Sequence, residues 1–552
     1  MNPDQNKYTF KFLSYYFNKD DLTATFCYQG IDNVIFTENV IFDKNPDGVP
    51  FNPTNDPQLN ELLDRAVFLA YILSGTSYYK AHPTPFIQLE VPLDAYQAGF
   101  FSLVYQEGLS QFAFENQLVR NNLAHFYATP NYTAKPAITD YKGTGCLALE
   151  SGGKDSLLVS EMLSQKEVDY TPWYVTSSED KSHPAVIDNL FDTLENRKAS
   201  ICVRKLDLAH LKESGGMNGH VPVTYIIESL ALIQAILNND DTVLTSIGQE
   251  GNEAHAMIGD LPVNHQWSKT WQAEQYMTAY INRYISPKLH VGSPIRHMSE
   301  LRIAKEFVEN CWVKYGYQFS SCNRANYTQK KNNGVLSWCG DCAKCANSYL
   351  LFCPFLPPQQ LQALFHDQDL FAKPTLAKTF KGLLGVDNEM KPFECIGSVD
   401  ELRTAYMNRM KVDPVPMDES KPQLSGFGLI DGETANNINQ AAGRLGLGGL
   451  FNRKAKKPEP VDPSQPKIVK LYQPLYVNLP FNVPEGHFDY MADFPSDPYF
   501  KDYIESHAGT WTAKKETERA KQRAERDAEA RAAESLNDFA NHFKTDKKKR
   551  RR

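Results

Sequence analysis

The chain has 552 residues, a formal net charge of −8 at pH 7, and a composition that is 42% hydrophobic and 12% aromatic. This length allows several domains of roughly 100–200 residues each, and the composition is typical of a soluble globular protein with a sizeable core. No run of about 18 apolar residues predicts a membrane span, and the start MNPDQNKYTF lacks the basic and apolar regions of a secretory signal, so we expect a cytoplasmic protein.

Charge and cysteine are distributed unevenly. Residues 513–552 carry 14 Lys+Arg against 8 Asp+Glu, which leaves residues 1–512 with a net charge of −14. An acidic body argues against RNA or DNA as the main substrate. Four of the ten cysteines fall between positions 322 and 345, a pattern that favours metal binding over disulfides in a chain without a secretory signal.

The first domain, residues 1–140, is predicted to be a β-rich α+β unit. Residues 8–43 hold three runs rich in aromatic and β-branched residues, separated by Asn/Asp/Gly turns. Leucine and alanine then recur at helical spacing over residues 57–77. The domain is expected to end near residue 140, after the proline-containing stretch ATPNYTAKPAITD.

Residues 141–355 are predicted to form an α/β catalytic domain. The apolar runs GCLALE, TPWYVTS, ASICVRKLD and TVLTSIG alternate with helical segments such as YIIESLALIQAIL. Such alternation predicts a parallel sheet with right-handed crossovers, and ligands of these sheets bind at the carboxyl ends of the strands. Cys27, Cys146, Cys202 and Cys353 lie in apolar contexts and are expected to be small core residues.

Three further segments complete the chain. Residues 356–415 are a mixed segment, and residues 416–511 are predicted to be a Gly/Pro-rich linker and a loosely ordered extension. Residues 512–552 are predicted to form an exposed, charged helix that ends in the basic run KKKRRR. That run is read as a solvated terminus, with a nuclear address or a contact to an anionic surface as alternatives. The sequence does not indicate a binding partner for this C-terminal extension.

The sequence Ser151-Gly152-Gly153-Lys154-Asp155-Ser156 lies between a predicted strand and a predicted helix. Two glycines let successive backbone N–H groups turn inward, which together with the helix start makes an anion-binding concavity. Ser151 and Ser156 add hydroxyl donors, and Asp155 is expected to hold Mg²⁺ on the phosphates. The string differs from a Walker A loop, because the earlier glycine is missing and Asp155 replaces Ser or Thr.

Cysteines 322, 339, 342 and 345 form a C-x16-C-x2-C-x2-C array. Closely spaced thiolates with one distant partner predict a tetrahedral zinc site, and four cysteines leave no open position for catalysis. The expected role is therefore structural. Unrelated free thiols and an iron–sulfur cluster are the alternatives.

The loop resembles the signature of the ATP pyrophosphatases (PP-loop enzymes), which implies a PP-loop, HUP-like fold and cleavage of ATP to AMP and pyrophosphate. Further strings occur in a specific order over residues 8–410: GHVPVT, EGNEA, NHQWSK, SELRIA, SCNR, WCGDCAKC and KPFECIG. Together they resemble the UDP-N-acetyl-alpha-D-muramoyl-L-alanyl-L-glutamate epimerases of peptidoglycan synthesis. Trp267 and Thr270 depart mildly from that pattern, and the last 140 or so residues have no counterpart in it.

The resemblance implies ATP-dependent inversion of the terminal L-glutamate of a UDP-muramoyl dipeptide. Adenylation of the glutamate α-carboxylate would remove its negative charge, so that an enolate can form. Reprotonation from the opposite face and hydrolysis would then release D-glutamate in the dipeptide, with AMP and pyrophosphate as by-products. ATP and Mg²⁺ are the implied cofactors, in addition to the zinc.

Inversion needs an acid and a base on opposite faces of the substrate. His265 is the first candidate because imidazole titrates near neutrality, and His220 and His255 are the competing candidates for its role. Lys269 and Glu253 complete the catalytic set. Positive charge and polar groups suited to phosphate or substrate contact come from a wider set: Asn264, Arg296, Arg302, Asn323 and Arg324. Lys269, Arg296 and Arg302 each have a surface ion pair as an alternative role.

Two other functions compete with the epimerase. A PP-loop enzyme that modifies tRNA or forms a nitrile would keep the loop and the cysteine array but act on another substrate, and the acidic body argues against tRNA. A non-catalytic nucleotide-binding regulator would use the charged C-terminal arm.

Overall fold

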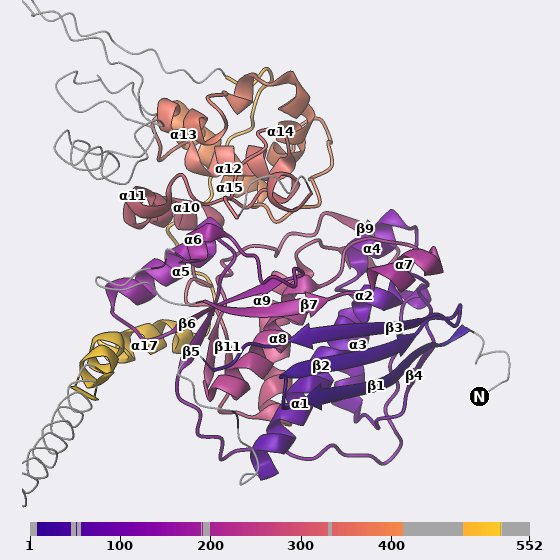
Figure 1. Cartoon of the computed structure of the whole chain (residues 1–552). Helices are drawn as coiled ribbons and strands as arrows, with labels where there is room; N and C mark the ends of the chain where they lie inside the picture. The colour runs from indigo at the N-terminus through magenta and orange to yellow at the C-terminus, as the bar shows by residue number, and fades with distance from the viewer. Residues whose placement is uncertain are drawn as a thin grey trace, which may run out of the picture.

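The computed structural model describes residues 8–45, 51, 57–188, 190, 199–328, 334–411, 478–518 and 520–521. Its centre is one nine-stranded sheet in the order β11-β8-β5-β6-β7-β3-β2-β1-β4 (Figure 1). A two-stranded ribbon, β9 (Ala256–Ile258) with β10 (Leu261–Val263), lies beside it. No helix in the described part of the chain is long and apolar enough to cross a membrane.

The N-terminal strands form an antiparallel meander, as the sequence predicts. These are β1 (Phe10–Asn18), β2 (Thr23–Gln29) and β3 (Ile35–Ile41), and β4 (Ile87–Leu89) adds to β1 in parallel. In β2, buried and half-buried residues alternate strictly, because successive side chains point to opposite faces of a sheet. The predicted first helix is α1 (Pro57–Ser74), whose second half is buried throughout.

The second part of the sheet is parallel, as predicted. It comprises β5 (Cys146–Leu149), β6 (Thr171–Thr176), β7 (Ser200–Lys205), β8 (Thr242–Leu244) and β11 (His290–Gly292). The chain proceeds from β5 outward to β6 and β7, then returns to β8 on the other side of β5. The carboxyl end of β5 is therefore a topological switch point, where ligands of such sheets bind.

The two parts share backbone hydrogen bonds. Strand β3 pairs antiparallel with β7, with Asn39 opposite Lys205 and Ile41 opposite Val203. The sheet is therefore mixed and continuous: the β-rich first segment extends the parallel sheet.

Helices cover both faces of the sheet. On one face, α1 packs with α8 (Val223–Asn238), α3 (Ala95–Gln106) and α9 (Trp271–Tyr280) in a single apolar core. On the other face, α5 (Lys154–Gln165) packs with α10 (Glu300–Asn310) in a second core. Strand β5 contributes Leu147 to the first core and Cys146 and Ala148 to the second, because adjacent residues face opposite sides.

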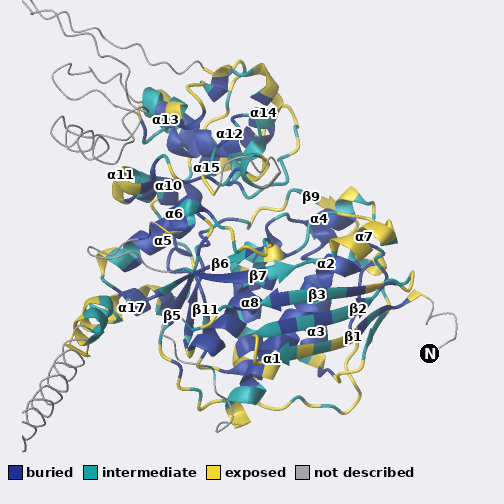
Figure 2. Ribbon diagram, in the orientation of Figure 1, coloured by how far each residue is buried: buried dark blue, intermediate teal, exposed yellow. Residues whose placement is uncertain are grey.

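A cluster of helices follows the sheet. It consists of α12 (Ala343–Phe352), α13 (Pro358–Leu364), α14 (Ala377–Leu384) and α15 (Val399–Lys411), which gather above α10 in Figure 1. The inner faces of α12 and α15 are buried (Figure 2). Cys146, Cys202 and Cys353 are buried as predicted, whereas Cys27 is only half-buried, because it faces the outer side of the meander beside Thr37.

Residues 478–511 run back over the helical cluster and the sheet. Helix α17 (Pro498–Ser506) covers the edge strand β11: the Tyr499 ring stacks on His290 at 3.9 Å, and Phe500 lies against Gly292. Of the predicted linker at 416–511, residues 416–477 lie outside the described part. Of the predicted C-terminal helix, residues 512–518 and 520–521 are helical, and the remainder, including KKKRRR, lies outside the described part.

Candidate active site

The glycine loop occupies the strand-to-helix turn that the sequence predicts. Strand β5 ends at Leu149, and α5 begins at Lys154 with Gly153 as its N-cap. Gly152 has φ +75°, and a Cβ there would lie 2.5 Å from the Leu336 side chain, so a larger residue would be strained. The amide of Gly153 donates to the Ser151 hydroxyl at 3.3 Å. Helix-terminal amides at such a turn can bind an anionic group.

Two carboxylates hold the lysine of this loop. The Lys154 ammonium lies 2.7 Å from Oδ1 of Asp155 and 2.7 Å from Oε2 of Glu300, the first residue of α10. Burial disfavours the charge of Lys154, but the two carboxylates outweigh burial and raise its pKa. Oε1 of Glu300 is buried without a hydrogen-bond partner among the described residues. Asp155 stays partly exposed, and its carboxylate is a ligand type that Mg²⁺ prefers.

A second buried acid directly precedes the loop. Glu150 accepts a hydrogen bond from the Ser160 hydroxyl, and burial raises the pKa of Glu150 to about 8. Glu150 is not among the site residues predicted from the sequence. The available signal was an acidic residue at the end of an apolar strand, immediately before the two glycines.

Lys269 and Glu250 form a largely buried ion pair near the loop. Their ammonium and carboxylate atoms lie 2.9 Å apart, and the Glu250 carboxylate also feels the charge of Lys154. Burial disfavours the ammonium of Lys269, but Cys395 and Glu250 outweigh burial and raise its pKa. Burial alone would raise the pKa of Glu250, yet Lys269 lowers it. Both groups are therefore charged at neutral pH.

Arg296 supports the backbone on which this pair is built. Its guanidinium is fully buried and bonded to Glu274, and it donates to the carbonyl oxygens of Gly248 at 2.7 Å and Lys269 at 2.8 Å. These contacts fix the backbone of Lys269 and leave Arg296 no exposed surface. All three guanidinium nitrogens of Arg296 are thus bonded to Glu274, Gly248 or Lys269.

The three candidate histidines are half-buried, and His265 lies near Lys269. The rings of His220 and His265 are 4.4 Å apart, and Nδ1 of His265 lies 2.5 Å from Oε1 of Gln111. Burial lowers the pKa of His265 to about 4; Glu394 opposes this shift, while Lys344 and Lys269 add to it. Burial likewise lowers the pKa of His220 to about 3, and that of His255 to about 4. All three rings are neutral at pH 7.

The remaining predicted site residues make contacts apart from the Lys154 and Lys269 ion pairs. Asn264 donates to the carbonyl of Gly251 and accepts from the amide of Gln266, which shapes the segment that carries His265. Glu253 pairs with Lys391 at 2.6 Å and is partly exposed. Asn323 and Arg324 lie beside the cysteine array, where Arg324 bonds the carbonyl of Asp341. Arg302 pairs with Asp493 at 2.7 Å.

The four cysteines converge as predicted. Sulfur–sulfur distances are 3.7 Å for Cys322–Cys342, 3.8 Å for Cys339–Cys345 and 3.5 Å for Cys342–Cys345, and all four atoms lie within 4.8 Å of one another. A tetrahedral site with Zn–S bonds of about 2.3 Å has sulfur–sulfur distances of about 3.8 Å. The amides of Ala325 and Asp341 also point at sulfur atoms of the array. The donor set thus fits one structural zinc.

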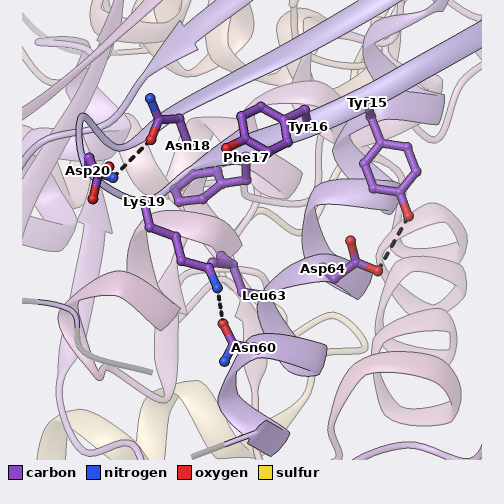
Figure 3. Close-up of a pocket in the computed structure, with 9 residues that line it drawn as sticks. All are labelled: Tyr15, Tyr16, Phe17, Asn18, Lys19, Asp20, Asn60, Leu63 and Asp64. Carbon is purple, nitrogen blue, oxygen red and sulfur yellow. Dashed lines mark hydrogen bonds between the residues drawn. The ribbon is translucent and has the colours of Figure 1, made fainter. Parts of the chain in front are cut away.

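Two hollows differ in their relation to these residues. A cavity of about 360 Å³ is bordered by Glu250, Glu253 and His255, together with Lys391 and Glu401. A larger hollow of about 550 Å³ lies at the far end of β1, where Lys19 bonds Asn60 and Tyr15 donates to Asp64 (Figure 3). None of the predicted site residues borders the latter, so the smaller cavity is the candidate substrate pocket.

Comparison with known proteins identifies relatives of the chain. A family model described as the MurL N-terminal domain matches residues 1–293, and one described as the MurL C-terminal domain matches residues 318–418. A UDP-N-acetyl-alpha-D-muramoyl-L-alanyl-L-glutamate epimerase from Xanthomonas oryzae pv. oryzae is 32% identical over 62% of this chain and 74% of its own length. The epimerase of the same name from Micromonospora sp. is 31% identical over 67% of this chain and 82% of its own length. No solved structure matches.

Proposed function

The chain belongs to the MurL family, and from that premise we propose that it epimerises the terminal L-glutamate of UDP-N-acetylmuramoyl-L-alanyl-L-glutamate, with ATP as the activating co-substrate. The relatives' shared name supports the reaction and the substrate. The observation that carries the ATP requirement is the glycine loop at the switch point, where Lys154 lies between Asp155 and Glu300. We further propose a PP-loop fold for residues 141–355. For the rest of the chain we keep the segments predicted from the sequence, which are residues 1–140, 356–415, 416–511 and 512–552.

Activation by ATP solves a charge problem. A proton beside an ionised carboxylate is very hard to remove, because a carbanion would form next to existing negative charge. Joining the α-carboxylate to AMP releases pyrophosphate and neutralises that carboxylate, and later hydrolysis restores it and releases AMP. In this scheme the loop residues 151–156 hold the phosphates, and Asp155 would hold Mg²⁺, which neutralises phosphate charge.

The proton transfers fall to residues around the Lys269–Glu250 pair. His265 is neutral at pH 7 and so can accept the α-proton. Lys269 stays protonated beside Glu250, so it can stabilise the enolate or return a proton. Glu253 is the third candidate. Asn264 positions His265 through the local backbone, and Asn323 and Arg324 are proposed to contact outlying parts of the substrate.

One assay tests the reaction. The full-length chain is incubated with UDP-N-acetylmuramoyl-L-alanyl-L-glutamate, ATP and Mg²⁺, and D-glutamate is measured after acid hydrolysis, alongside AMP and pyrophosphate. We expect D-glutamate and AMP to appear together, and UDP-N-acetylmuramoyl-L-alanine, which lacks the glutamate, to release no pyrophosphate. A folded preparation that makes no D-glutamate would overturn the proposal.

The variant His265→Asn separates activation from inversion. Loss of a positioned acid or base typically costs about 10²–10⁴ in rate. D-glutamate formation should therefore fall by about a hundredfold or more, while AMP formation persists. A parallel loss of both products would instead assign His265 to binding or folding.

A further inference from the structure

A segment beyond the family matches borders the candidate substrate pocket. The matched residues end at position 418, yet Phe488 and Phe494 line the cavity together with Glu250 and His255. Residues 478–494, which we call the strap, therefore add a wall to a pocket whose other sides come from the family region. Both rings are half-buried, so each still presents surface to the cavity.

The strap is fixed at both ends of this wall. The amide of Phe488 donates to the hydroxyl of Thr404 on α15 at 2.9 Å, and the amide of Phe494 donates to the carbonyl of His297 at 3.0 Å. Arg302 on α10 pairs with Asp493 at 2.7 Å. Gly486 permits this close approach, because a Cβ there would collide with the backbone nitrogen of Thr404. The wall is thus held by contacts that do not depend on the two phenyl side chains.

The chemistry of the cavity selects which end of the substrate it can take. At about 360 Å³ it is too small for a whole UDP-muramoyl dipeptide. Its border carries the ammonium of Lys391 among the carboxylates of Glu250, Glu253 and Glu401, so it offers a cation to a carboxylate of the terminal glutamate. Glu250, the partner of Lys269, and His255 border the cavity, so the peptide end, where the reacting carbon is, fits it best.

We propose that Phe488 and Phe494 contact the alanyl-glutamyl end of the substrate and act as positioning residues. This inference rests on the proposed function. The rings are parallel to within 13° with centroids 5.8 Å apart, so they form one apolar surface. Such a surface covers the alanine methyl group and the glutamate methylene groups, and it removes water from beside the reacting carbon.

The test uses the full-length double variant Phe488→Ala/Phe494→Ala. Loss of two aromatic contacts should raise KM for the UDP-muramoyl dipeptide about tenfold or more, while KM for ATP changes less than about twofold. The matched control is Phe481→Ala, a strap phenylalanine that packs near Lys381 and does not border the cavity. Its KM for the dipeptide should equal that of the wild type.

The outcomes separate this inference from the proposed function. If the wild type makes D-glutamate and a folded double variant keeps its KM, the inference is overturned and the function stands. If the wild type makes none, both are overturned. Should the double variant unfold, Phe494→Leu preserves apolar volume but lacks the ring, and it must still raise KM about threefold for the inference to hold.

Discussion

Replacing His220 with glutamine should make the protein less sensitive to acid. His220 is half-buried beside His265, and its desolvation, followed by the charges of His265 and Lys80, lowers its pKa to about 3. An unfolded histidine has a pKa of about 6.5. Between these values the unfolded chain binds a proton that the folded chain does not, so stability falls as pH falls from about 6.5 towards about 3.

The size of the effect follows from the shift. One pKa unit corresponds to about 1.36 kcal/mol, so at pH 5, about 1.5 units below the unfolded value, His220 costs about 2 kcal/mol of unfolding free energy relative to neutral pH. Urea unfolding of the wild type and His220→Gln at pH 7 and pH 5 measures this difference. On acidification, the unfolding free energy of the variant should fall by about 2 kcal/mol less than that of the wild type.

The control is His210→Gln. His210 is exposed, and the Asp207 carboxylate raises its pKa, so its contribution to stability has the opposite sign: it is present below the unfolded pKa and is lost as pH rises. On acidification, this control should lose at least as much unfolding free energy as the wild type. Equal acid sensitivity of His220→Gln and the wild type would refute the neutral state of His220 in the folded protein.

Three further predictions concern the loop, the metal and the buried arginine. Asp155→Asn should lower pyrophosphate release about a hundredfold or more, with an unchanged thermal midpoint; retained turnover would refute the role of Asp155 in holding metal. Purified protein should contain about one zinc per chain. Cys345→Ala should lose the zinc, as measured by elemental analysis, and should have a lower thermal midpoint, as measured by calorimetry. A wild type that holds no zinc and is no more stable than Cys345→Ala would contradict the site. Arg296→Leu leaves Glu274 buried and unpaired, so it should cost about 3–5 kcal/mol in urea unfolding, and the double variant Arg296→Leu/Glu274→Leu should recover part of that loss.

The sequence predicts local structure well where periodicity and turn chemistry agree. The three N-terminal strands, α1 and the strand–loop–helix at Gly152 all follow from such signals. The convergence of the cysteines also follows, because their spacing is itself the signal. The antiparallel pairing of β3 with β7 does not, since it joins segments far apart in the chain, such as Asn39 and Lys205, and leaves no local pattern.

The candidate site divides in the same way. Lys154, Asp155 and Lys269 come from motifs, and the structure surrounds them with buried partners. The surroundings of Arg296 and Arg302 could not be predicted, because a sequence shows an available charge but not the carboxylate that neutralises it in the fold. Glu300 became a partner of Lys154 only through the packing of α10 on α5.

The continuous sheet limits how the enzyme can move. Rotation of the N-terminal strands against the parallel strands would break the hydrogen bonds between β3 and β7, so these two parts behave as one rigid platform. We therefore expect any closing movement over substrate in the helical cluster that carries α12 and α15. The strap is bonded to that cluster at Thr404 and to the platform side at His297. It would therefore act as a tether that sets how far the pocket can open.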